Sequence, residues 1–265
     1  VTSIRDYIND GLTREGLLTV MPSGAARNAV DCALWDLEAK TSGKTIAELA
    51  GIPAPGPTIT AYTLSLDTPE KMGEAAKAQS HRPLIKLKLA GTGDVERVAA
   101  VRKAAPKTRL IVDANEAWTA DMMREYCPKM ADLGVELIEQ PLPAGEDSVL
   151  CDMDRPIPIC ADESAHDTAT LDDVAELYVY INIKLDKTGG LTEALLLAEA
   201  AREFGLGVMV GCMLGTSLAM APAMLLGSFA RFVDLDGPLL LEKDREHGIR
   251  FDGSVMHPPS RDLWG

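Results

Sequence analysis

Short apolar runs alternate with amphipathic stretches along most of this chain. Runs rich in β-branched residues predict strands at 58–64, 84–89, 109–113, 135–139, 157–161, 179–184, 206–211 and 231–235. Apolar positions with helical spacing lie between several of them, notably at 94–105, 119–133 and 192–204. The alternation predicts parallel strands joined by crossover helices, and eight strands within roughly 180 residues favour a closed α/β barrel over an open sheet.

The chain before residue 58 has a different pattern. It looks helical, and the stretch 25–40 places apolar residues opposite polar ones, Val30, Leu34 and Leu37 against Arg27, Asp31 and Glu38. The proline- and glycine-rich run at 51–57 then interrupts regular structure. We therefore expect a helical part at 1–57, a barrel of the (β/α)7β type at 58–238, and a C-terminal segment at 239–265 that returns to the N-terminal helices.

Three consecutive predicted strands end in a carboxylate, at Asp113, Glu139 and Asp162. The carboxyl ends of parallel barrel strands line one rim, so these side chains should converge. A hard divalent cation relieves the repulsion among three carboxylates, and monodentate oxygen ligands favour Mg²⁺ over zinc. The alternative is that each acid only caps the helix that follows it.

Lysines mark two further strand ends. Lys86 and Lys88 share one face of their strand, and because positions 85, 87 and 89 are apolar, the two lysines should point into the barrel. Repulsion between their ammonium groups is expected to lower a lysine pKa toward the range of a general base. Lys184 ends the sixth predicted strand, half a turn around the barrel from the second. Two such lysines would flank anything bound to the metal, unless they only snorkel at strand ends.

Composition narrows the functional classes. The formal net charge of −14 makes binding to nucleic acid unlikely, because such binding needs clustered basic residues. No apolar run reaches the ~18 residues that span a bilayer, and residues 1–5 show no signal-peptide core, so we expect a cytoplasmic protein without a membrane partner. The 5 cysteines form no Cys-x-x-Cys pair, so neither a disulfide framework nor a zinc site is indicated.

These residues resemble the enolase superfamily, and within it the muconate-lactonizing subgroup, which carries Lys-x-Lys on strand two and a base lysine on strand six. The similarity extends from Gly24 to Pro238. Several segments look like L-Ala-D/L-Glu dipeptide epimerases, among them 113–118, 139–143, 182–190 and the Asp-x-Asp of Asp234 and Asp236. In those enzymes the Asp-x-Asp holds the free α-ammonium of the substrate, a role that suits two carboxylates on one strand face. The alternative is that both pair with a lysine at the barrel mouth.

The resemblance implies a modified TIM barrel with part of an α+β capping domain in residues 1–57. It further implies a Mg²⁺ cofactor, a small-molecule dipeptide substrate, a place in peptidoglycan recycling, and a homo-oligomer as one alternative for assembly. The reaction would be a 1,1-proton transfer through an enediolate, with Lys88 and Lys184 acting on opposite faces of the α-carbon. By the same resemblance four residues would contact substrate: Thr63, Lys86, Cys212 and Leu214. Three of these have structural alternatives: Thr63 as a plain strand residue, Cys212 as a core residue, and Leu214 packed under the next helix.

One departure from the family stands out. Its members begin with a strand-rich capping segment whose mobile loop covers the active site, whereas this sequence starts in what should be the later helices of that cap. It is therefore either a piece of a longer chain or a variant without a lid. Two rival functions stay open: a lyase on the same site, such as o-succinylbenzoate synthase or a cycloisomerase, and an inactive lidless barrel. Asp234 and Asp236 argue against the lyases, whose substrates carry no ammonium group.

Overall fold

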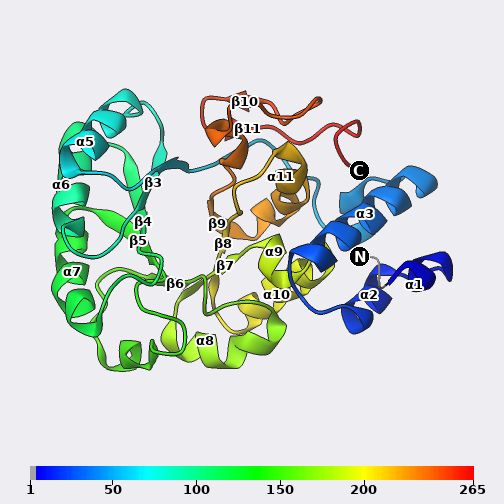
Figure 1. The fold of residues 1–265 in the computed structure, drawn as a ribbon, viewed down its shortest axis with the longest axis horizontal. Helices are drawn as coiled ribbons and strands as arrows, with labels where there is room; N and C mark the ends of the chain where they lie inside the picture. The colour runs from blue at the N-terminus through cyan, green and yellow to red at the C-terminus, as the bar shows by residue number, and fades with distance from the viewer. Residues whose placement is uncertain (1–3) are drawn as a thin grey trace.

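A curved sheet of parallel strands forms the centre of the molecule (Figure 1). This computed structural model describes residues 4–265. Residues 1–3, which belong to the N-terminal stretch predicted to lack a signal-peptide core, lie outside the described part. The strands follow one another in chain order: β2 (Tyr62–Leu64), β3 (Leu84–Lys88), β4 (Arg109–Asp113), β5 (Val135–Glu139), β6 (Ile159–Ala161), β7 (Tyr180–Ile183), β8 (Gly207–Val210) and β9 (Ala230–Val233). The first and last strands meet where the Ala61 N–H donates to the Val233 carbonyl at 2.8 Å. The predicted TIM-like α/β fold with an N-terminal capping portion is confirmed.

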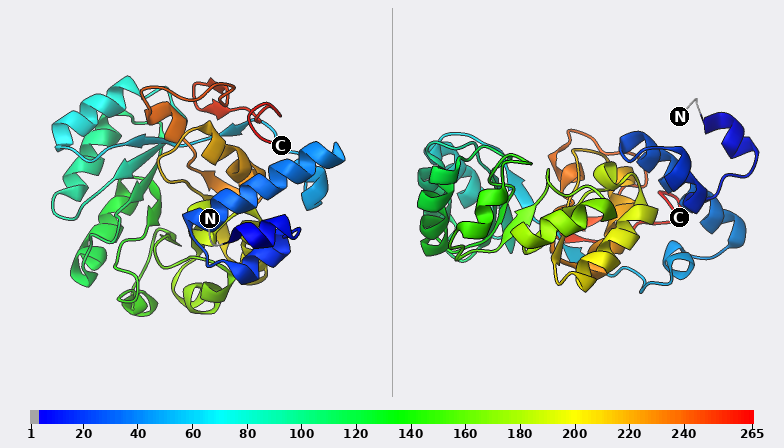
Figure 2. Two further views of the ribbon diagram at one scale, coloured as in Figure 1. Left: turned by 45° about the vertical axis from the view of Figure 1, so that its right-hand side comes forward. Right: turned by 90° about the horizontal axis from the view of Figure 1, so that it is seen from below.

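Helices cover the outside of this sheet, as the two views in Figure 2 show. They are α5 (Pro69–Ala78), α6 (Asp94–Ala104), α7 (Ala120–Asp132), α8 (Leu171–Leu177), α9 (Leu185–Thr188), α10 (Leu191–Glu203) and α11 (Ser217–Ala223). Alternation along each strand sends residues such as Ile85 and Leu87 outward into the main core against these helices. A second, smaller core fills the barrel itself, with Leu84, Ile111 and Phe232 among its members.

Two features depart from a regular alternation of strands and α-helices. Between β5 and β6 the chain forms only a 3₁₀ helix, η2 (Ser148–Asp152), in a stretch bounded by prolines at 141, 143, 156 and 158. The predicted strand 58–64 is divided at Thr60, whose N–H donates to the Ser254 carbonyl while its hydroxyl accepts from the Leu235 N–H. Residues before Thr60 form β1 (Thr58–Ile59), which pairs with β11 (Val255–Met256) and through it with β10 (Phe251–Asp252). The remaining 3₁₀ turns are η3 (Thr168–Thr170), η4 (Met224–Ser228) and η5 (Gly237–Leu240).

In the described part of the chain, four α-helices precede the barrel: α1 (Arg5–Asn9), α2 (Arg14–Val20), α3 (Ala25–Ser42) and α4 (Ile46–Ala50). Helix α3 forms where the sequence predicted it, but its buried face was predicted wrongly. Arg27 and Asp31 are buried, whereas Leu37 is 59% exposed, because α3 contacts the barrel through hydrogen bonds. The C-terminal segment reaches the same helix, since the Trp264 indole donates to the Cys32 carbonyl at 2.8 Å. Within residues 4–265 we find no helix with the length and apolar character needed to cross a membrane.

Candidate active site

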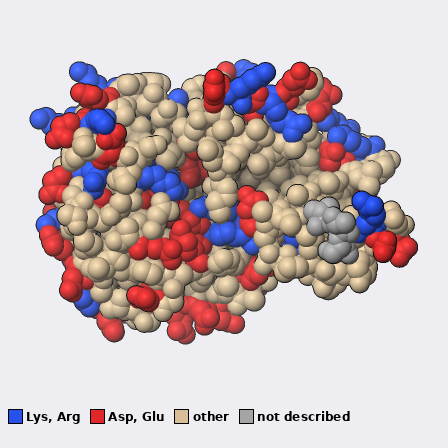
Figure 3. Space-filling model, viewed as in Figure 1, with Lys and Arg blue, Asp and Glu red and all other residues tan. Residues whose placement is uncertain are grey.

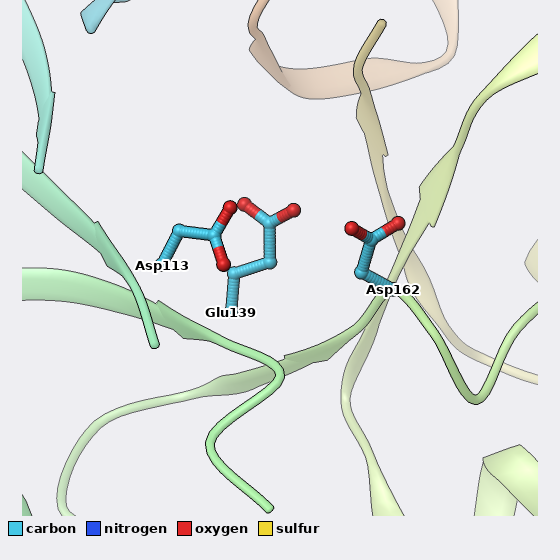
Figure 4. A group of neighbouring side chains, drawn as sticks. All are labelled: Asp113, Glu139 and Asp162. Atoms are coloured by element: carbon cyan, nitrogen blue, oxygen red, sulfur yellow. The ribbon is translucent and has the colours of Figure 1, made fainter. Parts of the chain in front are cut away.

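The three predicted carboxylates meet at one end of the barrel. Asp113 ends β4, Glu139 ends β5 directly beside it, and Asp162 follows β6. All three are buried, and one oxygen from each lies within 4.8 Å of the others. Figure 4 shows Asp113 and Asp162 on opposite sides of Glu139. The barrel therefore brings together three residues that are more than twenty positions apart in sequence.

Each outer carboxylate has a lysine of its own. Lys88 Nζ donates to Asp113 Oδ2 at 2.6 Å, and Lys184 Nζ donates to Asp162 Oδ2. Lys187 Nζ lies 2.6 Å from the other oxygen of Asp162. Lys88 therefore contacts one outer carboxylate of the triad and Lys184 contacts the other.

The central carboxylate and the innermost lysine share the floor of the site. Lys86 is 2% exposed and its Nζ lies 2.6 Å from Glu139 Oε2, 2.8 Å from Asp234 Oδ2 and 3.0 Å from Asp113 Oδ2. Asn182 Nδ2 donates to the second oxygen of Glu139 at 2.7 Å. Lys86 is the ion-pair partner of Glu139 Oε2, but this buried oxygen accepts no hydrogen bond of ordinary geometry, so its hydrogen-bonding capacity is not filled by the described residues.

Burial and charge shift the pKa values of these groups in opposite directions. Burial, reinforced by the negative charge of Asp113, raises the pKa of Glu139 to about 8. Burial also acts to raise the pKa of Asp162, but the ammonium groups of Lys187 and Lys184 outweigh it and hold this pKa well below its usual range. An additional cation beside Glu139 would favour its ionised form.

The predicted lowering of a lysine pKa was wrong for Lys86. Burial acts to lower the pKa of Lys86, but the carboxylates of Asp113, Asp234 and Glu139 outweigh it and raise this pKa well above its usual value. Lys184 behaves in the same way, because Asp162 and Glu139 raise its pKa against the effect of burial. The acids from other strands therefore decide the charge state of these lysines, and the repulsion between neighbouring lysines does not.

The donor set fits a hard divalent cation. Three carboxylates offer oxygen ligands from three rigid strand ends, and the central one keeps an oxygen without a hydrogen-bond donor. No histidine or cysteine belongs to the cluster found among residues 4–265, which disfavours a zinc-type site. The residues are thus those expected of a Mg²⁺ site.

A cavity of about 310 Å³ opens above the carboxylates. Its lining includes the two predicted bases, Lys88 and Lys184. It also includes all six residues predicted to contact substrate: Thr63, Lys86, Cys212, Leu214, Asp234 and Asp236. Figure 3 shows basic and acidic side chains meeting in the middle of this face of the molecule. A larger hollow of about 500 Å³ lies between α3 and α11, but none of the three carboxylates lines it.

The predicted substrate contacts differ in their surroundings. Asp234 pairs with Lys86, as the alternative interpretation proposed, while Asp236 Oδ2 accepts from the Thr63 N–H at 2.6 Å. Burial and the neighbouring Asp234 raise the pKa of Asp236 to about 6. Burial raises the pKa of the Cys212 thiol to about 12, so this thiol is a poor nucleophile. Leu214 is 69% exposed and does not pack under the following helix.

Several polar residues of the site were not predicted. They are Asn115, which accepts from Lys88 at 3.1 Å, Glu163 in the cavity lining, and Asn182 and Lys187 described above. Asn182 could have been found, because it precedes Lys184 by two positions and therefore shares its strand face. Lys187 follows Lys184 by three positions, and only the turn of α9 brings it back to Asp162.

Comparisons with known proteins agree with this architecture. Residues 70–261 match the family model described as enolase C-terminal domain-like, and residues 8–51 match the N-terminal domain of mandelate racemase / muconate lactonizing enzyme. The chain is 50% identical over 249 residues to N-acetyl-D-glutamate racemase from Pseudoalteromonas sp., covering 94% of this chain and 79% of that protein. It is 46% identical over 259 residues to L-Ala-D/L-Glu epimerase from Escherichia coli strain K12, covering 97% and 81%.

Solved structures show the same similarity. An enolase family member from Agrobacterium tumefaciens, with homology to dipeptide epimerases and with bound sodium and L-Ala-L-Glu, matches with a TM-score of 0.97 and 52% identity over 100% of this chain and 81% of that one. A dipeptide epimerase from Enterococcus faecalis, complexed with Mg and L-Leu-L-Tyr, matches with a TM-score of 0.85 and 29% identity, covering 94% and 75%. The chain therefore belongs to the mandelate racemase / muconate lactonizing enzyme family of the enolase superfamily, as an isomerase of the epimerase and racemase kind.

Proposed function

We propose that this protein is a Mg²⁺-dependent dipeptide epimerase of the L-Ala-D/L-Glu type. The observation that carries the proposal is the placement of Lys88 and Lys184 on opposite flanks of the carboxylate triad, within one cavity. Two amines facing a carbon from opposite sides can remove its proton on one side and return a proton on the other, which inverts the configuration.

The residues divide the work in a definite way. The α-proton beside a carboxylate is very weakly acidic, so the negative charge that develops as it leaves must be stabilised. A Mg²⁺ ion held by Asp113, Glu139 and Asp162 would supply positive charge beside the substrate carboxylate. Lys88 and Lys184 exchange the proton on the two faces, and the buried Lys86 remains a fixed cation. The raised pKa of Lys184 belongs to the metal-free arrangement, in which Asp162 is its partner.

The surroundings of Asp236 favour a substrate with an ammonium group. A bound Mg²⁺ and the four lysines of the cavity would together balance the formal charges of the six carboxylates that lie in or directly beneath it: Asp113, Glu139, Asp162, Glu163, Asp234 and Asp236. Asp236 accepts a hydrogen bond from a neutral backbone N–H and makes no ion pair within the described residues. The free α-ammonium of a dipeptide would supply the missing cation at this carboxylate.

A second candidate is an N-acylamino-acid racemase. The similarity to N-acetyl-D-glutamate racemase favours it, since the two sequences are 50% identical. An N-acetyl group carries no positive charge, however, and would leave Asp236 buried without a cation, which is unfavourable. The same argument applies to the lyase alternatives. Comparing kcat/KM for L-Ala-L-Glu and N-acetyl-D-glutamate, with Mg²⁺ present, separates the candidates.

Replacing either lysine by alanine tests the two-base assignment. We expect Lys88→Ala and Lys184→Ala each to lower epimerisation by about 10²–10⁴-fold, the usual contribution of a general base. Each variant should still exchange the α-proton of one epimer with deuterium in D₂O, measured by ¹H NMR, through the lysine that remains. Lys71→Ala, which removes an exposed lysine of α5, is the control. Single variants that epimerise at the wild-type rate would refute the assignment.

A further inference from the structure

A buried polar interface joins α3 to the segment that follows β7. We call residues 184–192 the lysine segment, because it begins with Lys184. Arg27 of α3 is 6% exposed, and its guanidinium donates to the Thr188 carbonyl at 2.6 Å and to the Gly189 carbonyl at 3.1 Å. The same guanidinium donates to the Met21 carbonyl at 3.1 Å. One buried charge therefore connects the N-terminal helices to the lysine segment.

A second buried group of α3 holds the far end of this segment. Asp31 is fully buried and accepts from the Thr192 N–H at 3.0 Å and from the Thr192 hydroxyl at 2.6 Å. The Trp35 indole donates to the same hydroxyl at 3.0 Å. Asn28 adds a hydrogen bond of 2.9 Å to Asp186. Charge-assisted hydrogen bonds of this kind are stronger and more directional than neutral ones.

Two glycines let the backbone approach α3 this closely. Gly189 and Gly190 have φ angles of 75° and 127°, which residues with a side chain rarely adopt. A Cβ at position 189 would lie 2.4 Å from Arg27 Nε, and one at position 190 would lie 2.4 Å from Asp31 Cβ. Arg27 and Asp31 thus fill the space against which the lysine segment turns.

The interface acts on Lys184 through a single helical turn. Lys184 is the N-cap of α9, which spans only Leu185–Thr188 and ends at the carbonyls that Arg27 binds. A helix of one turn has little stability of its own. Its position therefore depends on contacts at both ends, with Asp162 at the start and α3 at the finish.

We propose that Arg27 and Asp31 are positioning residues for Lys184, so that α3 fixes the base on one face of the substrate and has no part in fixing Lys88 on the other. This inference rests on the proposed function, in which Lys184 is one of two bases. Lys88 lies within β3 and is bonded to Asp113 and Asn115, and none of its hydrogen bonds or ion pairs involves α3. Displacement of a reacting group by about 1 Å can lower the rate by about 10²-fold, so the contacts of Arg27 and Asp31 with the lysine segment should affect catalysis.

The test uses Arg27→Met and Arg27→Lys. Because Arg27→Met removes buried hydrogen bonds and risks misfolding, the milder Thr192→Val, which removes only the hydroxyl between Asp31 and Trp35, is included. Arg102→Met is the matched control, since Arg102 also donates to backbone carbonyls, including Leu133 and Thr108 at 2.7 Å, but does so away from the site. Two readouts are measured: hydrogen–deuterium exchange of the amides at 185–190, and α-proton exchange from each substrate epimer.

We expect faster amide exchange at 185–190 in the Arg27 variants and, to a smaller extent, in Thr192→Val. We also expect a loss of about 10–100-fold in α-proton exchange for the epimer that Lys184→Ala identifies as its own, with the other epimer nearly unaffected. Arg27→Lys should recover part of the loss. Unchanged amide protection, or equal losses for both epimers, would overturn the inference. If the wild-type protein exchanges neither epimer, the proposed function fails instead, and the amide exchange still decides whether Arg27 holds the segment.

Discussion

The cavity has two walls that each carry a lysine ammonium group: an open wall with Lys88 and an enclosed wall with Lys184. The two walls hold this group in different ways. The Lys88 side chain is 35% exposed and is positioned by its own strand, β3, beside Asp113 and Asn115. The Lys184 side chain is 8% exposed, and it follows its strand into α9 and shares Asp162 with Lys187. The Lys88 amine is thus partly exposed to solvent, whereas the Lys184 amine lies among buried charged groups.

This difference shows how a nearly symmetrical reaction can use an unsymmetrical protein. In the proposed reaction the two epimers of the substrate need an amine on each face of the α-carbon, but the barrel supplies those faces from strands with different neighbours. The position of Lys88 follows from the sheet alone, whereas that of Lys184 depends on α9 and on a helix more than 140 residues earlier in the chain. Damage to the two walls should therefore have unequal consequences.

The largest effect is expected from Asp162→Asn compared with Asp113→Asn. Both substitutions should lower Mg²⁺-dependent turnover by at least about a thousandfold. Each removes several kcal/mol of charge stabilisation, and every ~1.4 kcal/mol corresponds to a tenfold change in rate. In protein freed of metal by a chelator, however, Asp162→Asn removes the nearest carboxylate of two buried ammonium groups and leaves only Glu139, 3.9 Å from Lys184, at a cost of about 3–5 kcal/mol. Asp113→Asn leaves Lys86 with Glu139 and Asp234, and leaves Lys88 partly in water, so it should destabilise less.

Chemical denaturation of both variants without metal measures this contrast. The proteins are compared with the wild type in buffer containing a chelator, and Mg²⁺ titration by calorimetry gives the loss of affinity in parallel. Equal losses in the free energy of unfolding would mean that the enclosed wall depends on its carboxylate no more than the open wall does.

The sequence predicted the site where strand order alone determines neighbours. Asp113, Glu139 and Asp162 end consecutive parallel strands, so the topology places them together whatever the loops do. Lys86 and Lys88 were assigned to the inner face from the alternation along one strand, and that inference needs no tertiary information.

The sequence failed where distant groups decide the outcome. Arg27 and Asp31 look like the solvated face of an amphipathic helix, because their partners are backbone groups of 188–192 that no local pattern reveals. The raised pKa of Lys86 likewise depends on Glu139 and Asp234, which arrive from other strands. The spacing of polar residues along a helix does not reveal whether they are buried against a hydrogen-bonding partner or exposed to water.

An intermediate effect is expected from Gly211→Ala, which links the Lys184 wall to the floor of the site. Asn182 lies on β7 and donates to Glu139, and a Cβ at position 211 would lie 2.6 Å from the Asn182 amide oxygen. The added methyl group should push the amide away from Glu139 and weaken Mg²⁺ binding by about 10–100-fold, as is usual when a partner of a metal ligand is lost. Gly227→Ala is the control, because nothing lies within 4 Å of its added Cβ. Unchanged affinity in Gly211→Ala would show that Glu139 needs no help from β7.

The smallest effect is an isotopic difference between the two directions of the reaction in the wild-type protein. Exposed ammonium groups exchange their protons with solvent faster than enclosed ones, so a proton taken by Lys88 should be replaced by deuterium before it can return. A proton taken by Lys184 should more often go back to the same substrate molecule, because the side chain is enclosed by Asp162 and its neighbours. We therefore expect recovered substrate to contain several-fold less deuterium when Lys184 removes the proton.

The measurement is mass spectrometry of unreacted substrate at partial conversion in D₂O, starting from each epimer in turn. The variants Lys88→Ala and Lys184→Ala identify which epimer belongs to which base. Loosening the enclosed wall with Arg27→Lys should raise the deuterium content toward that of the other direction, since water then reaches Lys184 more readily. Equal deuterium in both directions of the wild-type reaction would mean that the difference in exposure between the two amines does not survive substrate binding. In that case the different surroundings of Lys88 and Lys184 would affect the stability of the fold but not the proton transfer.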